Sequence, residues 1–348
     1  MSVLYTSLLR PLLFQLPAEA AHDIGKATLK HAFPWNVLSR MFRVDDPRLH
    51  TRVGGLELSS PVGLAAGFDK NAEALAGLDH LGFGYLTVGS ILPTERPGNA
   101  KPRLIRYPDK ESMLNCYGLP SDGLERCAQR LEAFRATRPR TPVIANIDSP
   151  SEESYLKSFA RVEPYVDAVE FGVQCPNNPD DHGEFHNHAA FESLLKSALK
   201  VRTKPVFVKI VSYQDEKQRQ NRLELVEIAA SLGVDGITVP GAWRQPEPKL
   251  SMGYGHSSGH MLFSKTLQTV RDVYSITRGR VAIKANGGIF TGDEAFQVLA
   301  AGASTVELLT GFVYRGWDVA ERINRELLAL LDEHRVPEVR RVREFAMA

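Results

Sequence analysis

Short apolar runs rich in Val, Ile, Thr and Gly alternate with helical patterns along most of the chain. The eight runs cover residues 62–67, 85–90, 143–147, 168–173, 206–210, 236–241, 281–287 and 305–311. Helical patterns lie between and after them, at residues 72–81, 124–136, 190–201, 222–232, 265–276, 293–301 and 319–334. Eight buried strands that alternate with helices are typical of a closed parallel barrel. The sequence therefore predicts a (β/α)8 TIM-type barrel rather than a doubly wound sheet, because no G-x-G-x-x-G follows the first run.

One interval between two of these runs is much longer than a simple turn. Residues 90–143 contain Pro93, Pro97, Gly98, Pro102 and Pro108. Prolines at this density interrupt helices and central strands, because each lacks a backbone N–H. We expect an inserted loop or a small antiparallel excursion over one end of the barrel.

The segment before the barrel predicts two short amphipathic helices. Leucines recur at three- and four-residue spacing from Leu4 to Leu13, with Arg10 on the polar side, and Pro17 begins a second helical pattern. Such helices either dock on a domain or lie at a membrane surface, and their periodicity is the same in both cases. We expect residues 1–40 to form a helical cap and residues 41–348 to form the barrel.

Charge and cysteine content exclude several classes of protein. The 42 basic residues against 41 acidic ones give a net charge of +1, without the basic excess of a nucleic-acid binder. Cys116, Cys127 and Cys175 are too few and too scattered for a disulfide framework or a Cys-rich zinc site. No apolar stretch approaches the roughly 18 residues of a membrane span, and no signal peptide is recognisable. We therefore expect a protein of a reducing compartment that binds no nucleic acid.

Small, polar and cationic residues follow the predicted strands. Because the carboxyl ends of parallel barrel strands share one rim, these residues should meet there. Gly287-Gly288 and Thr310-Gly311, after the last two strands, can present backbone N–H groups to a phosphate. Lys70 and Lys209 place positive charge where an electron-rich ring would bind. The pattern favours flavin mononucleotide over a dinucleotide, although glycine is also common in ordinary βα turns.

Several collinear segments resemble the dihydroorotate dehydrogenase family, specifically its membrane-associated, quinone-linked class. They are Gly63-Leu64-Ala65-Ala66-Gly67-Phe68-Asp69-Lys70, Leu81-Gly82-Phe83-Gly84, Arg96-Pro97-Gly98-Asn99, Lys101-Pro102-Arg103-Leu104 and Ala300-Ala301-Gly302-Ala303-Ser304, together with Leu13-Phe14-Gln15-Leu16 and Ala21-His22. The resemblance implies an FMN-binding barrel that oxidises a small molecule. It also implies a two-helix cap that contacts the membrane and guides quinone to the flavin.

The resemblance assigns roles to individual residues. FMN is expected to contact Ala66, Gly67, Lys70, Ser90, Asn146, Lys209, Gly259, Gly287, Gly288, Thr310 and Gly311. His22 and Arg106 match the quinone path, and Lys70, Asn115 and Asn177 match substrate contacts. Cys175 falls at the position of the catalytic base. Oxidation of a C–C bond next to a carbonyl needs such a base, and a thiol with a reference pKa of roughly 8.5 suits it near neutral pH.

Other positions depart from the family. The membrane-associated class uses Ser as the base, whereas this chain has Cys175, the residue of the soluble class. Gly172 and Gly241 stand where the family has Asn side chains that clamp the substrate ring, and only Asn115 and Asn177 remain of four. Each buried partner left unpaired costs about 1–3 kcal/mol of binding. The cofactor half of the site is kept and the substrate half is altered.

Two further segments leave alternatives open. Residues 180–188 carry three His and three carboxylates, which suit either a metal or, more simply, a solvated polar lid, so that no metal is expected. Residues 243–260, which include Met252, Tyr254, His256 and His260, form either a pocket wall or a surface loop.

The altered substrate half favours an FMN-dependent paralogue that acts on a different small substrate. A genuine dihydroorotate dehydrogenase of pyrimidine biosynthesis with an unusual Cys base is the alternative. A non-catalytic FMN-binding protein is a third hypothesis, against which the retained Lys70, Lys209 and Cys175 argue. The expected location is the cytoplasmic face of the bacterial inner membrane, bound peripherally, or otherwise the cytoplasm.

Overall fold

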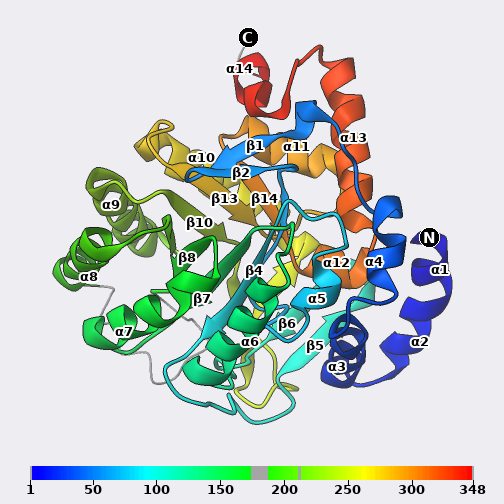
Figure 1. Ribbon diagram of the computed structural model, residues 1–348, viewed down its shortest axis with the longest axis horizontal. Coiled ribbons are helices and arrows are strands. Elements are labelled where there is room, and N and C mark those ends of the chain that lie inside the picture. The colour runs from blue at the N-terminus through cyan, green and yellow to red at the C-terminus, as the bar shows by residue number, and fades with distance from the viewer. Residues whose placement is uncertain (1, 174–186, 211–212, 347–348) are drawn as a thin grey trace.

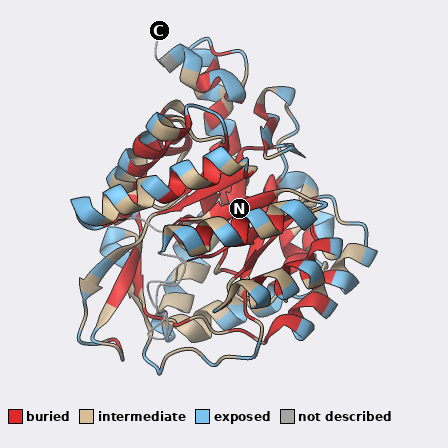
Figure 2. Cartoon of the chain, turned by 90° about the vertical axis from the view of Figure 1, so that its left-hand side faces the viewer, coloured by how far each residue is buried: buried red, intermediate tan, exposed pale blue. Residues whose placement is uncertain are grey.

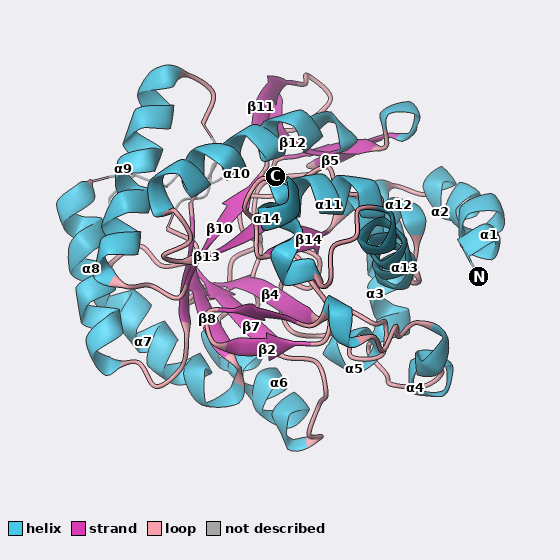
Figure 3. Ribbon diagram, turned by 90° about the horizontal axis from the view of Figure 1, so that it is seen from above, coloured by secondary structure: helices cyan, strands magenta, loops and turns pink. Residues whose placement is uncertain are grey.

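Eight parallel strands close into a barrel at the centre of the computed structural model, which describes residues 2–173, 187–210 and 213–346. Going round the barrel, the order is β10-β13-β14-β3-β4-β7-β8-β9. The bounds are β3 Val62–Leu64, β4 Tyr85–Ile91, β7 Val143–Ile147, β8 Ala168–Phe171, β9 Val206–Lys209, β10 Gly236–Pro240, β13 Ala282–Asn286 and β14 Thr305–Leu308. Seen from above, helices surround these strands (Figure 3). The predicted (β/α)8 barrel is confirmed.

The outer ring follows the predicted alternation of strands and helices. Its helices are α5 Leu75–Leu78, α6 Leu124–Ala136, α7 Glu152–Val162, α8 His188–Val201, α9 Glu216–Leu232, α10 Phe263–Thr277, α11 Gly292–Ala300, α12 Thr310–Arg315 and α13 Val319–Glu333, and α14 Val342–Ala346 follows (Figure 1). Most bounds agree with the sequence patterns within a few residues. Helix α9 begins earlier than its apolar pattern, because the carboxylate of Asp215 accepts a hydrogen bond from the Gln218 N–H and caps the helix there.

One predicted helix is mostly absent. The pattern over residues 72–81 predicts about three turns, but only α5 is helical there. The buried carboxylate of Asp69 accepts hydrogen bonds from the backbone N–H groups of Glu73 and Ala74, at 2.9 and 2.8 Å. Ala72 has a φ of 57°, outside the helical region. The prediction was wrong because a side chain captures the donors that a helix would have used.

The long interval contributes to a second sheet above the carboxyl ends of the barrel strands. Strands β5 Leu104–Tyr107 and β6 Ser112–Asn115 from this interval pair antiparallel with each other. Strands β11 Trp243–Pro246 and β12 Tyr254–Gly259 complete a four-stranded sheet in the order β11-β12-β6-β5. We call it the cover sheet. The predicted antiparallel excursion is confirmed, and residues 243–260 belong to the same sheet.

The opposite end of the barrel is closed by a hairpin. Strands β1 Thr51–Val53 and β2 Leu56–Leu58 pair antiparallel. Val53 and Leu58 join an apolar cluster with Tyr85, Ile144 and Phe207 from the barrel interior. This end of the barrel is therefore filled with apolar side chains.

The N-terminal segment lies against one side of the barrel mouth as a series of short helices. Residues 2–15 include α1 Ser2–Leu4 and α2 Arg10–Gln15, joined by one wider turn, and α3 Ala18–Leu29 and α4 Trp35–Leu38 follow. The Tyr5 hydroxyl donates to the Val313 carbonyl at 2.6 Å, and the Tyr5 ring lies 5.3 Å from that of Trp317. We call this segment the cap; its boundary at residue 40 stays a prediction.

The outward face of the cap is unusually apolar. Val3, Leu4, Leu8 and Leu12 are between 49% and 72% exposed, and pale blue faces mark the outer sides of the helices beside the N-terminus (Figure 2). Docking therefore accounts for only part of the apolar pattern. Within the described residues, no helix is both long enough and apolar enough to cross a membrane.

The helix-to-barrel packing makes a direct stability prediction. Phe159 on α7 is 1% exposed and packs edge-on against Phe171 of β8, with ring centroids 5.7 Å apart. Phe159→Ala should lower the free energy of unfolding by about 3–5 kcal/mol, through lost burial and a residual cavity. The control is Phe33→Ala, at a side chain that is 73% exposed. It should change the free energy of unfolding by less than about 0.5 kcal/mol. Urea denaturation curves that coincide for the two variants would contradict this packing.

Candidate functional site

A cavity of about 540 Å³ lies at the carboxyl ends of the barrel strands, below the cover sheet and beside the cap. The residues proposed for function from the sequence are concentrated in its wall. They are Ala66, Gly67, Lys70, Ser90, Lys209, Gly259, Gly287, Gly288, Thr310 and Gly311, together with Asn115, His22 and Arg106. The volume is in the range of small-molecule and cofactor sites.

Lys70 is a cation of the cavity wall that is held by two contacts. Its Nζ donates a hydrogen bond to the Gly67 carbonyl at 2.6 Å and lies 4.3 Å from the centroid of the Tyr117 ring. Burial, followed by the charges of Lys26 and Arg103, lowers the pKa of Lys70 to about 8. The group is therefore still a cation at neutral pH, but one whose charge is poorly hydrated and available to a bound anion.

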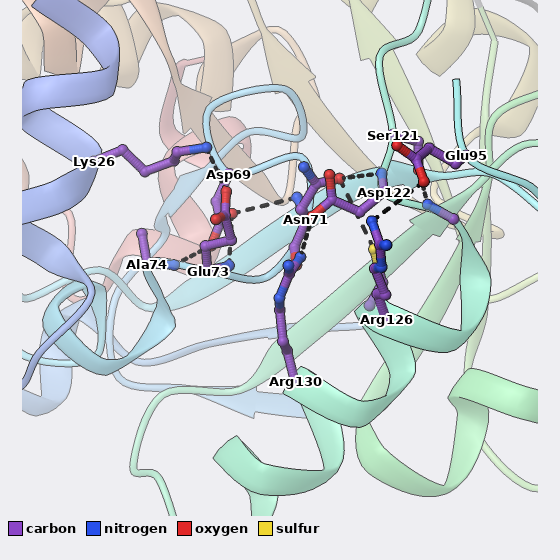
Figure 4. A network of polar contacts seen from close by, with 12 residues as sticks. Lys26, Asp69, Asn71, Glu73, Ala74, Glu95, Ser121, Asp122, Arg126 and Arg130 are labelled. Carbon is purple, nitrogen blue, oxygen red and sulfur yellow. Dashed lines mark hydrogen bonds and ion pairs between the residues drawn. The ribbon is translucent and has the colours of Figure 1, made fainter. Parts of the chain in front are cut away.

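The loop that carries Lys70 is held from two sides (Figure 4). Glu73 forms ion pairs with Lys26 and Lys30 of the cap, which hold the pKa of Glu73 near 2 against the opposing effect of its burial. On the barrel side, the Arg130 guanidinium donates to the Asn71 carbonyl at 3.0 Å. Lys70 therefore sits on a rigid loop that joins the cap to the barrel.

Glycines shape the part of the wall after the seventh and eighth strands. Gly288 has a φ of 78°, and a Cβ there would lie 2.5 Å from the Phe263 nitrogen. A Cβ on Gly311 would lie 2.6 Å from the Ile289 carbonyl oxygen. Only glycine allows the backbone to approach so closely here. Because α12 begins at Thr310, its first backbone N–H groups have no partner within the helix and lie at the cavity.

Asn146 is the one described cofactor candidate that does not form part of the wall. It is fully buried behind Ser90, whose hydroxyl donates to the Asn146 Oδ1. The Asn146 Nδ2 donates to Glu170 at 2.8 Å. Asn146 therefore orients Ser90 rather than lining the cavity itself.

A charged cluster lies beneath the cavity, and the sequence analysis missed it. Lys284, in the middle of β13, forms ion pairs with Glu170 and Glu307 at 2.9 and 3.0 Å. Each of these three charged residues lies inside an otherwise apolar strand. Because ions are rarely buried unless they are paired, this pattern is the sequence signal that could have revealed the cluster.

The cavity continues between the cap and the barrel with an apolar lining. Leu9, Leu13 and Leu29 of the cap line this part. The Arg106 guanidinium donates to the carbonyls of Phe14 and Leu16 and lies 4.4 Å from the Phe14 ring centroid. The arrangement gives one connected space with a polar end inside the barrel mouth and an apolar end under the cap.

His22 is an uncharged polar group at the boundary between these two ends. Its ring lies 5.1 Å from that of Phe68. Burial, followed by the charges of Lys70 and Lys26, lowers the pKa of His22 to about 3. The imidazole is therefore neutral at physiological pH.

The cover sheet supplies the polar groups that face the barrel mouth. Asn115 pairs across the sheet with Leu104 on one side and His256 on the other. Paired residues point to the same face of a sheet, and all three line the cavity. Burial, followed by the charge of Arg244, lowers the pKa of His256 to about 4, so that it is neutral. Residues 243–260 thus include a pocket wall, which is the first of the two readings left open above.

The barrel rim opposite the cover sheet has few side chains. Gly172, Gly241 and Ala242 line the cavity there. A Cβ on Gly241 would lie 2.7 Å from the Thr266 hydroxyl oxygen, so the local packing leaves no room for a side chain. Cys175 and Asn177 lie outside the described residues, as does most of the His-rich segment 180–188. Among the residues that are described, no group of three or more His, Cys, Asp or Glu could hold a metal ion.

Comparisons with known proteins agree on one family. Residues 48–331 match the family model described as dihydroorotate dehydrogenase. A protein of Roseiflexus castenholzii named dihydroorotate dehydrogenase (quinone) is 34% identical over 341 residues, which cover 93% of this chain and 92% of the relative. A protein of Halobacterium salinarum with the same name is also 34% identical, with 93% and 95% covered. The crystal structure of the Eimeria tenella enzyme in complex with ferulenol superposes with a TM-score of 0.81 at 29% identity, over 93% of this chain and 94% of the other.

His22 predicts a pH dependence of stability. A histidine with a pKa near 3 in the folded state and 6.5 when unfolded stabilises the fold above pH 6.5, and this contribution is lost as the pH falls towards 3. As the pH falls from 6.5 to 4.5, the free energy of unfolding should decrease in both proteins. The decrease should be smaller in His22→Gln than in the wild type, by about 1.4 kcal/mol per pH unit. His31→Gln, at an exposed histidine, is the control. Denaturation curves with equal pH slopes for the His22 variant and the wild type would contradict the partly buried, neutral imidazole.

Proposed function

The chain belongs to the dihydroorotate dehydrogenase family and is a dehydrogenase that acts on a CH–CH bond; we propose that it oxidises dihydroorotate to orotate, with FMN as cofactor and a quinone as electron acceptor. The observation that supports this most directly is the connected cavity, whose polar end is at the barrel mouth and whose apolar end is under the cap. The names of the relatives favour dihydroorotate over the different substrate that the altered side chains predict. On this point the alternative given in the sequence analysis replaces its first hypothesis.

The residues at the polar end fit FMN. Lys70 and Lys209 supply two cations, Ser90 a hydroxyl group, and Gly288 and Gly311 a backbone surface at the start of a helix. A phosphate is stabilised by backbone N–H groups at a helix N-terminus, and an electron-rich ring by nearby cations. Bound by these residues, FMN would supply the redox chemistry, namely acceptance of a hydride and transfer of its electrons to the acceptor.

The protein's own part in the reaction is to orient the substrate and move a proton. Asn115 and His256 project from the cover sheet towards the barrel mouth and can donate or accept hydrogen bonds to a flat, polar ring. The Lys70 ammonium can hold an anionic group of the substrate. Cys175, as thiolate, removes the proton from the carbon next to the carbonyl while hydride leaves the neighbouring carbon.

The cap provides the path for a hydrophobic acceptor. The apolar lining under α2 and α3 leads from the outer face of the cap to His22 at the boundary of the polar end. A neutral imidazole and a guanidinium that is held by backbone carbonyls can meet a quinone carbonyl without closing the path. We infer a peripheral position at the cytoplasmic face of the bacterial inner membrane, with Leu4, Leu8 and Leu12 in the lipid interface.

One observation favours a second candidate, a paralogue with a different small substrate. Gly172 and Gly241 leave the barrel rim without the amide side chains that the family resemblance leads one to expect, and Thr266 occupies the space beside Gly241. A buried polar ring that loses two partners binds more weakly by about 1–3 kcal/mol for each. Orotate binding separates the two candidates.

The first prediction here concerns cofactor and product. The purified protein should be yellow, release FMN on denaturation, and show a flavin absorbance change when orotate is added in the micromolar range. An absorbance change that appears only at millimolar orotate, or no absorbance change at all, supports the second candidate. A colourless protein that takes up no FMN on reconstitution contradicts both.

Cys175 gives the second prediction. Cys175→Ala should keep FMN but reduce the rate of flavin reduction by dihydroorotate about 10²–10⁴-fold, the usual contribution of a general base. Cys175→Ser should retain a small activity with a shifted pH profile, because an alkoxide forms less readily than a thiolate. Cys127→Ala, at a buried cysteine away from the cavity wall, is the control. Normal turnover of the Cys175→Ala enzyme would exclude this role.

The cap gives the third prediction. Leu8→Glu combined with Leu12→Glu places charge on the exposed face without touching the cavity wall. The variant should lose binding to vesicles and turnover with long-chain quinone, yet keep turnover with a short, water-soluble quinone. Val201→Glu, at a valine that is 57% exposed on α8, should change none of these. Unchanged sedimentation with vesicles would mean that the cap is only a packing element.

A further inference from the structure

A lysine at the centre of the barrel is completely removed from water. The side chain of Lys284 is 0% exposed, and those of its partners Glu170 and Glu307 are each 1% exposed. The aromatic rings of Tyr85 and Phe207 lie below it, with centroids 5.4 and 5.1 Å from Nζ. Burial opposes the charge of Lys284, but the two carboxylates outweigh it and raise its pKa. The charged form of the lysine is therefore favoured, and two ion pairs hold the ammonium between the carboxylates.

Each carboxylate connects this lysine to side chains at the floor of the cavity. Glu170 accepts a hydrogen bond from the Asn146 Nδ2, and Asn146 in turn accepts one from the Ser90 hydroxyl. Glu307 accepts one from the Asn286 Nδ2 at 3.4 Å. Ser90, Asn286 and Glu307 itself all line the cavity. Two hydrogen-bonded chains thus run from one ammonium to the surface that a ligand would meet.

The second cation of the cavity competes for the same carboxylate. Lys209 of β9 pairs in register with Thr238 of β10, which pairs in turn with Lys284 of β13. Paired residues point to the same face of a sheet, so the three side chains all point into the barrel interior. The charges of Lys284 and then Lys209 lower the pKa of Glu170, although burial acts in the opposite direction. If Lys284 were absent, Lys209 would be the nearest cation left to neutralise Glu170.

We propose that Lys284 is a positioning residue for the cofactor. By neutralising Glu170 and Glu307, it keeps Asn146 and Asn286 oriented below the cavity, and it leaves the Lys209 ammonium free to face the cofactor. This inference rests on the proposed function, because it takes FMN as the group that Lys209 and Ser90 meet.

The substitution Lys284→Met tests the proposal, since methionine keeps much of the length and volume but not the charge. The two carboxylates would then face each other with Lys209 as their only nearby cation. Lys209 is drawn towards Glu170, so the reduced, anionic flavin loses a stabilising charge. In the holoenzyme, the midpoint potential of the flavin should become more negative, and FMN release should be faster by about tenfold or more.

A compensating variant separates charge from packing. In Lys284→Met combined with Glu170→Gln and Glu307→Gln, no buried carboxylate is left without its cation. The glutamine Oε1 at position 170 can still accept from Asn146 and its Nε2 can donate to Thr238. No carboxylate at position 170 then attracts Lys209. The flavin potential should return to that of the wild type, and FMN release to within about threefold of it. Lys204→Met, at a partly buried lysine that bonds backbone carbonyls at the other end of the barrel, is the control for removal of a lysine.

The outcomes are distinct. If the wild-type protein carries no FMN, the proposed function fails before the inference is reached. If the wild type carries FMN and Lys284→Met changes only the melting temperature, with potential and release rate unchanged, the inference is wrong. If Lys284→Met does not fold, the combined variant decides: wild-type flavin properties support the proposal, and an altered potential or rapid FMN loss contradicts it.

Discussion

The ion pairs of Lys284 with Glu170 and Glu307 divide the barrel interior into two halves. Below them, the hairpin of β1 and β2 and the ring of Phe207 make a dry apolar core. Above them lies the cavity, whose wall includes the polar side chains of Ser90, Lys209 and Asn286. Burying three ions is costly, and removing one partner from such a cluster typically costs about 3–5 kcal/mol. Apolar residues at these three positions would stabilise the barrel as well as the ion pairs do. The cluster is therefore best explained by the polar side chains that it orients at the floor of the cavity.

The closed parallel sheet brings the functional side chains together, and two additions turn the rim into a site. The cover sheet places Asn115 and His256 over the barrel mouth, and the cap extends the cavity with apolar walls. Ion pairs of Glu73 with Lys26 and Lys30 join the cap to the loop of Lys70. The apolar and polar ends of the cavity are thus joined through one short loop.

The barrel could be predicted from the sequence because its eight strands are separate apolar runs with helical patterns between them. Most residues of the cavity wall could be predicted as well, because the residues that follow parallel strands meet at one rim of the barrel. The helix predicted over residues 72–81 is mostly absent, and this could not be foreseen, because the Asp69 side chain captures the backbone donors that its first turn would have used. The Lys284 cluster was missed for a different reason: its three charges lie far apart in sequence and become partners only when the barrel closes. The partnership of Asn115 with His256 depends in the same way on strand pairing.

The most direct test of the account is an anaerobic mixing experiment with the purified holoenzyme. Dihydroorotate is added first, and the flavin absorbance near its visible maximum is followed; a long-chain quinone is added afterwards. The account predicts that the flavin is bleached by dihydroorotate within the time of a single turnover and recovers its absorbance when quinone arrives. A flavin that stays oxidised with dihydroorotate, while a chemical reductant bleaches it and quinone restores it, would contradict the assignment of the substrate.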